Sequence, residues 1–160
     1  MQATEPGPRI VDVALRHRAF AVDEDRLGAV FHALDRWPVH AVAPGELSIV
    51  LTTEQELADL HERFLGDPSP TDVITFPGDP EAAFAGEICL SLDRAEAEAS
   101  KRAHPPGQEA TLYLVHGWLH LAGLRDETAA ARAAMREAET AALEYLARGD
   151  RAVTDWLRPR

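Results

Sequence analysis

Cysteine and long apolar runs are what this sequence of 160 residues most clearly lacks. Its single cysteine, Cys89, excludes an internal disulfide and is typical of a reducing compartment, which predicts a cytoplasmic location. No apolar run is long enough to cross a bilayer, and residues 1–8 lack the charged and apolar regions of a signal peptide. We therefore expect no membrane contact, a loose leader at residues 1–8 and a single domain over residues 9–160.

Positive charge is also scarce. The chain has 16 basic residues against 27 acidic ones, for a net charge of −11, and residues 46–103 hold most of that excess acid. Because phosphate contacts need Lys or Arg, this composition speaks against a general nucleic-acid binder, and no DNA partner is expected. Any contact with a nucleic acid requires the basic residues to gather locally. Candidates for such a basic rim are Arg63, Arg102, Arg125, Arg132, Arg136 and the C-terminal arginines.

The hydrophobic pattern alternates between strands and helices along the chain. Strands are predicted at residues 9–15, 46–51, 71–76 and 86–92, and helices at residues 23–37, 53–64, 93–102, 108–122 and 128–147. Early alternation favours parallel pairing, whereas the short connection between the third and fourth strands favours an antiparallel pair. The sequence thus predicts an α+β fold, with a small mixed four-stranded sheet and about five helices.

The predicted helix at residues 108–122 contains the strongest candidates for metal ligands. It is apolar on nearly every face, which indicates a buried helix, yet it contains His116 and His120 one turn apart. Gly123 is placed to end this helix, and Asp126 is the first acid after the turn. Two imidazoles and a carboxylate with a fourth position open are the pattern of a catalytic zinc site. We therefore predict that His116, His120 and Asp126 bind one metal ion.

The same spacing occurs in metzincin proteases, which carry Glu directly after the first His as their general base. That position is Gly117 here, so a protease needs a base from elsewhere. Asp72 and Glu87 are candidate bases. A turn or capping role is the preferred alternative for Asp72, and a solvent-facing strand position explains Glu87 equally well. Arg125 is a candidate for phosphate contact, or a surface residue paired with a neighbouring acid.

Two sequence blocks resemble one known family. His-Gly-Trp-Leu-His-Leu-Ala-Gly at residues 116–123 is similar to the signature of the YbeY family of rRNA-maturation endoribonucleases. Pro-Thr-Asp-Val-Ile-Thr-Phe-Pro at residues 70–77 and Gly-Glu-Ile-Cys-Leu-Ser at residues 86–91 match it in order and spacing. The resemblance implies an α+β fold, a zinc ion bound by three His, and cleavage of single-stranded RNA in rRNA maturation and ribosome quality control. It also implies a ribosomal or ribosome-associated partner.

The chain departs from that family at three places. The third His of the family is Asp126 here, and its usual Tyr-Asp pair is Leu124-Arg125. A family Arg thought to matter for activity aligns with Leu65. Carboxylate oxygen is an acceptable zinc ligand, so we carry the metal role over to Asp126. A zinc metallopeptidase, and a ribosome-associated factor with little or no nuclease activity, stay open as alternatives.

Overall fold

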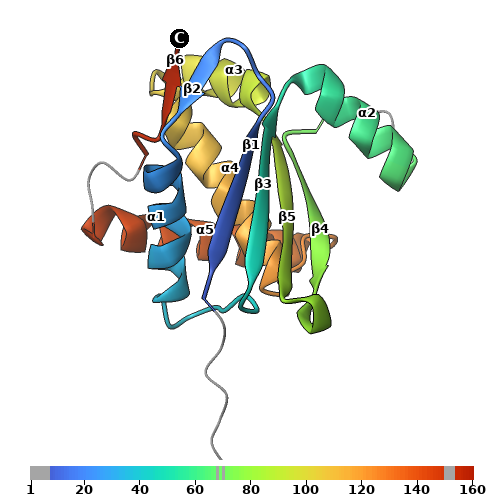
Figure 1. Cartoon of the computed structure of the whole chain (residues 1–160), viewed down its shortest axis with the longest axis vertical. Helices are drawn as coiled ribbons and strands as arrows, with labels where there is room; N and C mark the ends of the chain where they lie inside the picture. Colours follow the sequence, from blue (N-terminus) through green and yellow to red (C-terminus); the bar gives the residue numbers. More distant parts are fainter. Residues whose placement is uncertain (1–7, 68, 70, 150–153) are drawn as a thin grey trace, which may run out of the picture.

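The computed structural model describes residues 8–67, 69, 71–149 and 154–160, and its centre is a twisted four-stranded sheet (Figure 1). Its strands are β1 (Ile10–Leu15), β3 (Glu46–Thr52), β5 (Phe84–Ser91) and β4 (Val73–Asp79), in that spatial order. The β1–β3 and β3–β5 pairs are parallel and the β4–β5 pair is antiparallel. The predicted α+β class and mixed sheet are therefore confirmed, and β4 is an edge strand.

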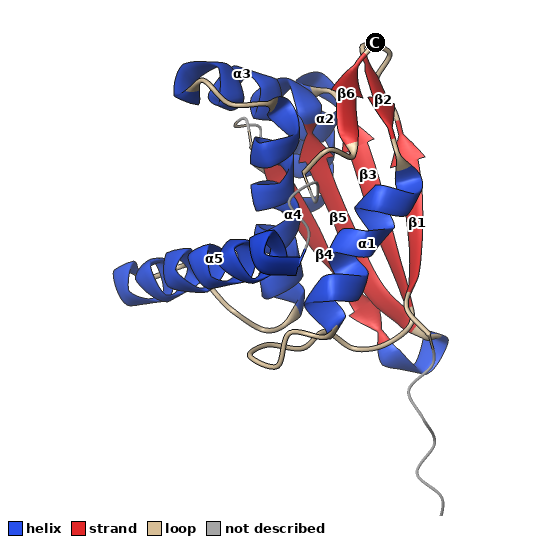
Figure 2. Cartoon of the chain, turned by 90° about the vertical axis from the view of Figure 1, so that its left-hand side faces the viewer, coloured by secondary structure: helices blue, strands red, loops and turns tan. Residues whose placement is uncertain are grey.

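Five α-helices accompany the sheet in the described part of the chain: α1 (Glu24–Asp35), α2 (Glu54–Leu65), α3 (Leu92–Arg102), α4 (Pro106–Leu121) and α5 (Ala129–Gly149). Figure 2 shows α4 and α5 on the same side of the sheet. The main core lies between that sheet face and α1 and α4, and α5 packs onto it through Met135, Ala138 and Ala142. None of the described helices is long and apolar enough to cross a membrane.

Helix α2 packs on the opposite face of the sheet, where Leu57, Ile74 and the buried Cys89 form a smaller cluster. Helix α2 begins after Thr53, whose hydroxyl accepts a hydrogen bond from the Glu56 amide. This second face is otherwise sparsely covered, and Ile10 on β1 is 57% exposed. The metal-site candidates on α4 therefore belong to the well-packed side of the molecule.

Two local predictions were wrong. Strand β4 does not stop at Pro77 but continues to Asp79. The Ser91 amide donates to the Asp72 carbonyl, so the alternation of an antiparallel ladder turns the Pro77 nitrogen away from β5. A proline is tolerated on the free side of an edge strand because no ladder bond is lost there. The second error concerns the helix predicted from residue 93, for which the sequence suggests Asp93 as the N-terminal cap. Ser91 caps α3 instead, and Asp93 accepts a hydrogen bond from the Glu54 amide at the start of α2.

A second sheet was not predicted. It pairs β2 (Phe20–Val22) antiparallel to β6 (Leu157–Pro159), so residues near the C-terminal end of the chain lie beside residues 20–22. Trp156 is fully buried beside it and donates to the Thr111 hydroxyl on α4 (2.9 Å). Strands of three residues are too short to show a hydrophobic period. This small sheet lies near the N-terminal end of α4, whereas the His pair lies near its C-terminal end.

Candidate metal centre

Helix α4 presents His116 and His120 one above the other, both partly buried (24% and 26% exposed side chains). Their Nε2 atoms are 3.0 Å apart. Between them, Gly117 lies against β5, because a Cβ atom added there would be 2.7 Å from Ile88 Cγ2. The absence of a side chain at Gly117 thus lets α4 lie close to the Ile88 side chain. The helix is held near the sheet, and its two imidazoles are thereby fixed in place.

The turn after α4 places the third candidate ligand, Asp126, beside the two His residues. Gly123 adopts a left-handed conformation (φ 104°), and the Leu124 amide returns to the Leu119 carbonyl (3.0 Å). This turn brings Asp126 Oδ2 to 3.3 Å from His120 Nε2 and 3.6 Å from His116 Nε2. The structure thus assembles the three residues that the sequence singled out, on one helix and the turn that follows it.

Each imidazole is oriented through its other nitrogen. His120 Nδ1 is 3.0 Å from the Leu124 carbonyl oxygen, and His116 Nδ1 is 2.6 Å from Glu139 Oε1 on α5. A carbonyl and a carboxylate can only accept, so both Nδ1 atoms carry the proton and donate it. When both imidazoles are neutral, their Nε2 atoms therefore carry lone pairs, which face each other and Asp126 Oδ2.

These residues fit a divalent metal ion. The three donor atoms are separated by 3.0, 3.3 and 3.6 Å. Ligand atoms held about 2.1 Å from a tetrahedral zinc ion would be about 3.4 Å apart, so the observed triangle has the right size. Facing lone pairs and a carboxylate also repel one another unless a positive charge lies among them. Two His and one Asp with one side open are a donor set that zinc accepts.

The charges around the site are negative. Burial lowers the pKa of His116, but the hydrogen bond and charge of Glu139, with the charges of Asp126 and Asp72, outweigh burial and hold that pKa above its ordinary value. The groups that favour a proton on His116 would equally favour a metal cation among the ligands. The described residues of this region thus have the charge and the donor atoms to hold a cation.

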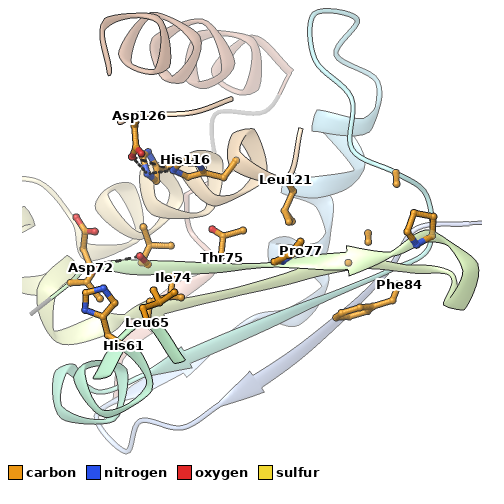
Figure 3. A pocket seen from close by; sticks show the side chains of 17 residues that line it. His61, Leu65, Asp72, Ile74, Thr75, Pro77, Phe84, His116, Leu121 and Asp126 are labelled. Atoms are coloured by element: carbon orange, nitrogen blue, oxygen red, sulfur yellow. Dashed lines mark hydrogen bonds and ion pairs between the residues drawn. The ribbon is translucent and has the colours of Figure 1, made fainter. Parts of the chain in front are cut away.

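A groove of about 530 Å³ opens in front of the cluster and follows the edge strand β4 (Figure 3). Figure 3 shows Asp72 and Thr75 on the side of β4 where His116 and Asp126 lie, and His61 and Leu65 on the other side. Among the described residues, no Lys or Arg lines this groove. The predicted basic rim is therefore missing from the groove wall.

The weaker candidates lie in different places. Asp72 is in the groove wall, and its charge acts on His116. Glu87 is not in the wall; it accepts from the Cys89 thiol on the α2 face of the sheet, away from the His pair. Arg125 is largely exposed (77%) and pairs with Glu127, as a surface residue would. Leu65, the position at which the family resemblance implies an Arg, lines the groove.

Glu139 is the residue of the site that the sequence prediction missed. Its position in the chain does carry a signal, because it follows Met135 by four residues and precedes Ala142 by three. Both of those residues are buried, so Glu139 is an acid on the apolar stripe of α5. An acid on a packed helix face needs a partner, and the candidate partners were the His residues of the most apolar helix.

Comparison with known proteins identifies the family. The sequence profile of the family described as Endoribonuclease YbeY matches residues 18–147. A Cutibacterium acnes protein named Endoribonuclease YbeY is 33% identical over 124 residues, which cover 71% of this chain and 79% of that protein. An Acidothermus cellulolyticus protein of the same name is 39% identical over 117 residues, covering 64% of this chain and 70% of that protein.

A solved structure shares the fold. It is the solution structure of a Thermotoga maritima protein, which superposes with a TM-score of 0.60 at 23% identity. The match covers 89% of this chain and 93% of that one. At this identity the likeness concerns the fold alone. From the profile match, together with the sequence identity to its named members, the chain belongs to the YbeY family.

Proposed function

We propose that this chain is a zinc-dependent endoribonuclease that hydrolyses phosphodiester bonds of single-stranded RNA. The observation that carries the proposal is the triangle of His116, His120 and Asp126 facing an open groove, in a chain of this family. One zinc ion per chain is expected. The cellular role proposed with it is rRNA maturation and ribosome quality control in the cytoplasm, with the ribosome or a ribosome-associated protein as partner.

The metal, when bound, would polarise a phosphoryl oxygen or activate a water molecule for attack. The residues of this chain supply the rest. His116 and His120 offer neutral nitrogens whose orientation is set by Glu139 and the Leu124 carbonyl. Asp72 is the carboxylate of the groove wall that is not a ligand, so we propose that it accepts a proton from the attacking water. A flexible single strand can bend a phosphate into such an open groove, whereas a duplex resists it.

The metallopeptidase alternative is disfavoured by the packing of α4. In the proteases with this ligand spacing, the residue after the first His is a Glu that acts as general base. Here that residue is Gly117, whose Cα faces Ile88 of β5 so closely that even a methyl group would be crowded. The sheet thus leaves no room for a side chain that could act as general base at position 117. Phosphodiester hydrolysis does not require a base at that position.

Cleavage assays with a matched His variant test the proposal. Wild-type protein should cleave single-stranded RNA and leave casein intact, and His120→Ala should abolish both RNA cleavage and zinc content. His32→Ala is the control, because His32 is an exposed His on α1, outside the groove. Cleavage of casein without RNA cleavage would support the peptidase. Ribosome co-sedimentation with both substrates intact would support the factor without nuclease activity.

A further inference from the structure

The Glu139 side chain forms a hydrogen bond that links α5 to α4. It lies on α5 with a side chain only 16% exposed, and its Oε1 atom is 2.6 Å from His116 Nδ1 on α4. These two residues are 23 positions apart in the chain. Removing a carboxylate from water is costly unless it is hydrogen-bonded, so this short bond accounts for an acid on a packed helix face.

The two imidazoles are held by different means. His120 donates to the carbonyl of Leu124, four residues further along the same turn, so its orientation follows from the local backbone. His116 has no such local acceptor in the described structure and takes its acceptor from α5 instead. The ring of His116 is therefore the one whose orientation and tautomer depend on tertiary packing.

The charge of the cluster also depends on Glu139. With both His neutral, Asp126 and Glu139 contribute two negative charges within one cluster of side chains. Their combined charge of about −2 would balance the charge of a divalent metal cation. Because carboxylate partners raise the basicity of the imidazoles that they hold, the effect of Glu139 should be felt at His116 Nε2.

We infer that Glu139 is a positioning residue of the metal site, which fixes His116 in its Nδ1–H tautomer and supplies one of the two charges that balance the cation. The inference rests on the proposed metal site and adds α5 to it. Glu139 does not touch the metal position, so its effect reaches the ion only through His116.

Three variants separate the hydrogen bond from the charge. Glu139→Ala removes both, whereas Glu139→Gln removes the charge and keeps an acceptor oxygen. Glu137→Ala is the matched control, because Glu137 is an exposed acid two residues away on the same helix. Zinc affinity would be measured by competition with a chromophoric chelator. Glu139→Ala should bind zinc about 10- to 100-fold more weakly, Glu139→Gln should lose less, and Glu137→Ala should equal wild type.

A second measurement needs no metal. In alkaline buffer without zinc, nitrogen NMR of the imidazoles should show the Nδ1–H tautomer of His116 in wild type and Glu139→Gln, and a mixture of tautomers in Glu139→Ala. Unchanged zinc affinity and an unchanged tautomer in Glu139→Ala would overturn the role of Glu139 alone. Absence of zinc binding in wild type would instead overturn the proposed metal site itself.

Discussion

At the scale of single residues, Asp126 is where this chain departs from the three-His site that its family resemblance implies. Asp126→His should retain or strengthen zinc binding, because imidazole suits zinc at least as well as carboxylate. Asp126→Ala should lose a ligand and weaken it. Zinc retained after dialysis would be compared with that of Glu127→Ala, which removes an exposed neighbouring acid (69%). Equal retention in Asp126→Ala and Glu127→Ala would remove Asp126 from the ligand set.

Asp72 presents a different case, because it lies in the groove wall but outside the three-ligand cluster. If it accepts the proton of the attacking water, Asp72→Asn should lower kcat for RNA cleavage by about 10²- to 10⁴-fold. Zinc content and KM should change little. Glu87→Gln, on the other face of the sheet, provides the control. A kcat for Asp72→Asn within twofold of wild type would leave the proton acceptor unassigned.

At the scale of elements, the contact between α4 and β5 sets the distance of the candidate metal site from the sheet. Gly117→Ala would place a methyl group 2.7 Å from Ile88 Cγ2, so we expect a loss of about 1–3 kcal/mol in unfolding free energy, measured by urea denaturation. Combining it with Ile88→Ala should cost less than the sum of the two single changes. Gly28→Ala on α1 is the control, since its nearest new neighbour is 4.0 Å away. Strict additivity of Gly117→Ala and Ile88→Ala would argue against this contact.

The start of α2 depends on an acid from another helix. Asp93 on α3 accepts from the Glu54 amide (2.8 Å) and from His17 (2.8 Å). Burial raises the pKa of Asp93, but these two hydrogen bonds outweigh it and hold that pKa below its ordinary value. Such a carboxylate stabilises the fold above its unfolded pKa, and this contribution is lost as the pH falls through the folded pKa.

Asp93→Ala should therefore lower the unfolding free energy at neutral pH by about 1 kcal/mol, the usual effect of losing a capping side chain. The difference from wild type should shrink as the pH falls below about 4, the ordinary range of an Asp pKa. Denaturation midpoints at several pH values give both results, and Glu96→Ala, an exposed acid on α3, is the control. A difference that persists unchanged in acid would mean that the Asp93 charge has no part in capping α2.

At the scale of the whole molecule, a net charge of −11 is at odds with an RNA substrate. Among the described residues, no Lys or Arg lines the groove, and Leu65 is part of its wall. RNA binding by wild type should thus be weak and should depend little on salt. Leu65→Arg should strengthen it and steepen the slope of log affinity against log salt by roughly 0.7 for one new phosphate contact.

The matched control for that change is Gln55→Arg, which adds the same charge to α2 ten residues earlier, roughly 15 Å along the helix. Arg125→Ala should leave affinity and slope unchanged, because Arg125 pairs with Glu127 rather than facing the groove. A gain from Gln55→Arg equal to that from Leu65→Arg would show that overall charge, and not the groove, sets RNA affinity.

The features that could be predicted from the sequence are those that depend on neighbours in the chain. A helix places His116 and His120 on one face through its own geometry, and Gly123 turns the backbone within a few residues of Asp126. Hydrophobic periodicity likewise located the long helices and the four main strands, because each of these elements repeats its pattern over several residues.

Other features depended on which elements meet in space. Glu139 reaches His116 across 23 residues, and Asp93 caps α2 across 39 residues. Pro77 stays inside β4 because that strand occupies the edge of the sheet, and β6 exists only because β2 offers it a partner. None of these contacts alters the local hydrophobic pattern, since each is set by the packing of whole helices and strands. The three candidate ligands of the site were therefore evident in the sequence, whereas the acid that is hydrogen-bonded to His116 was decided by the docking of α5 against α4.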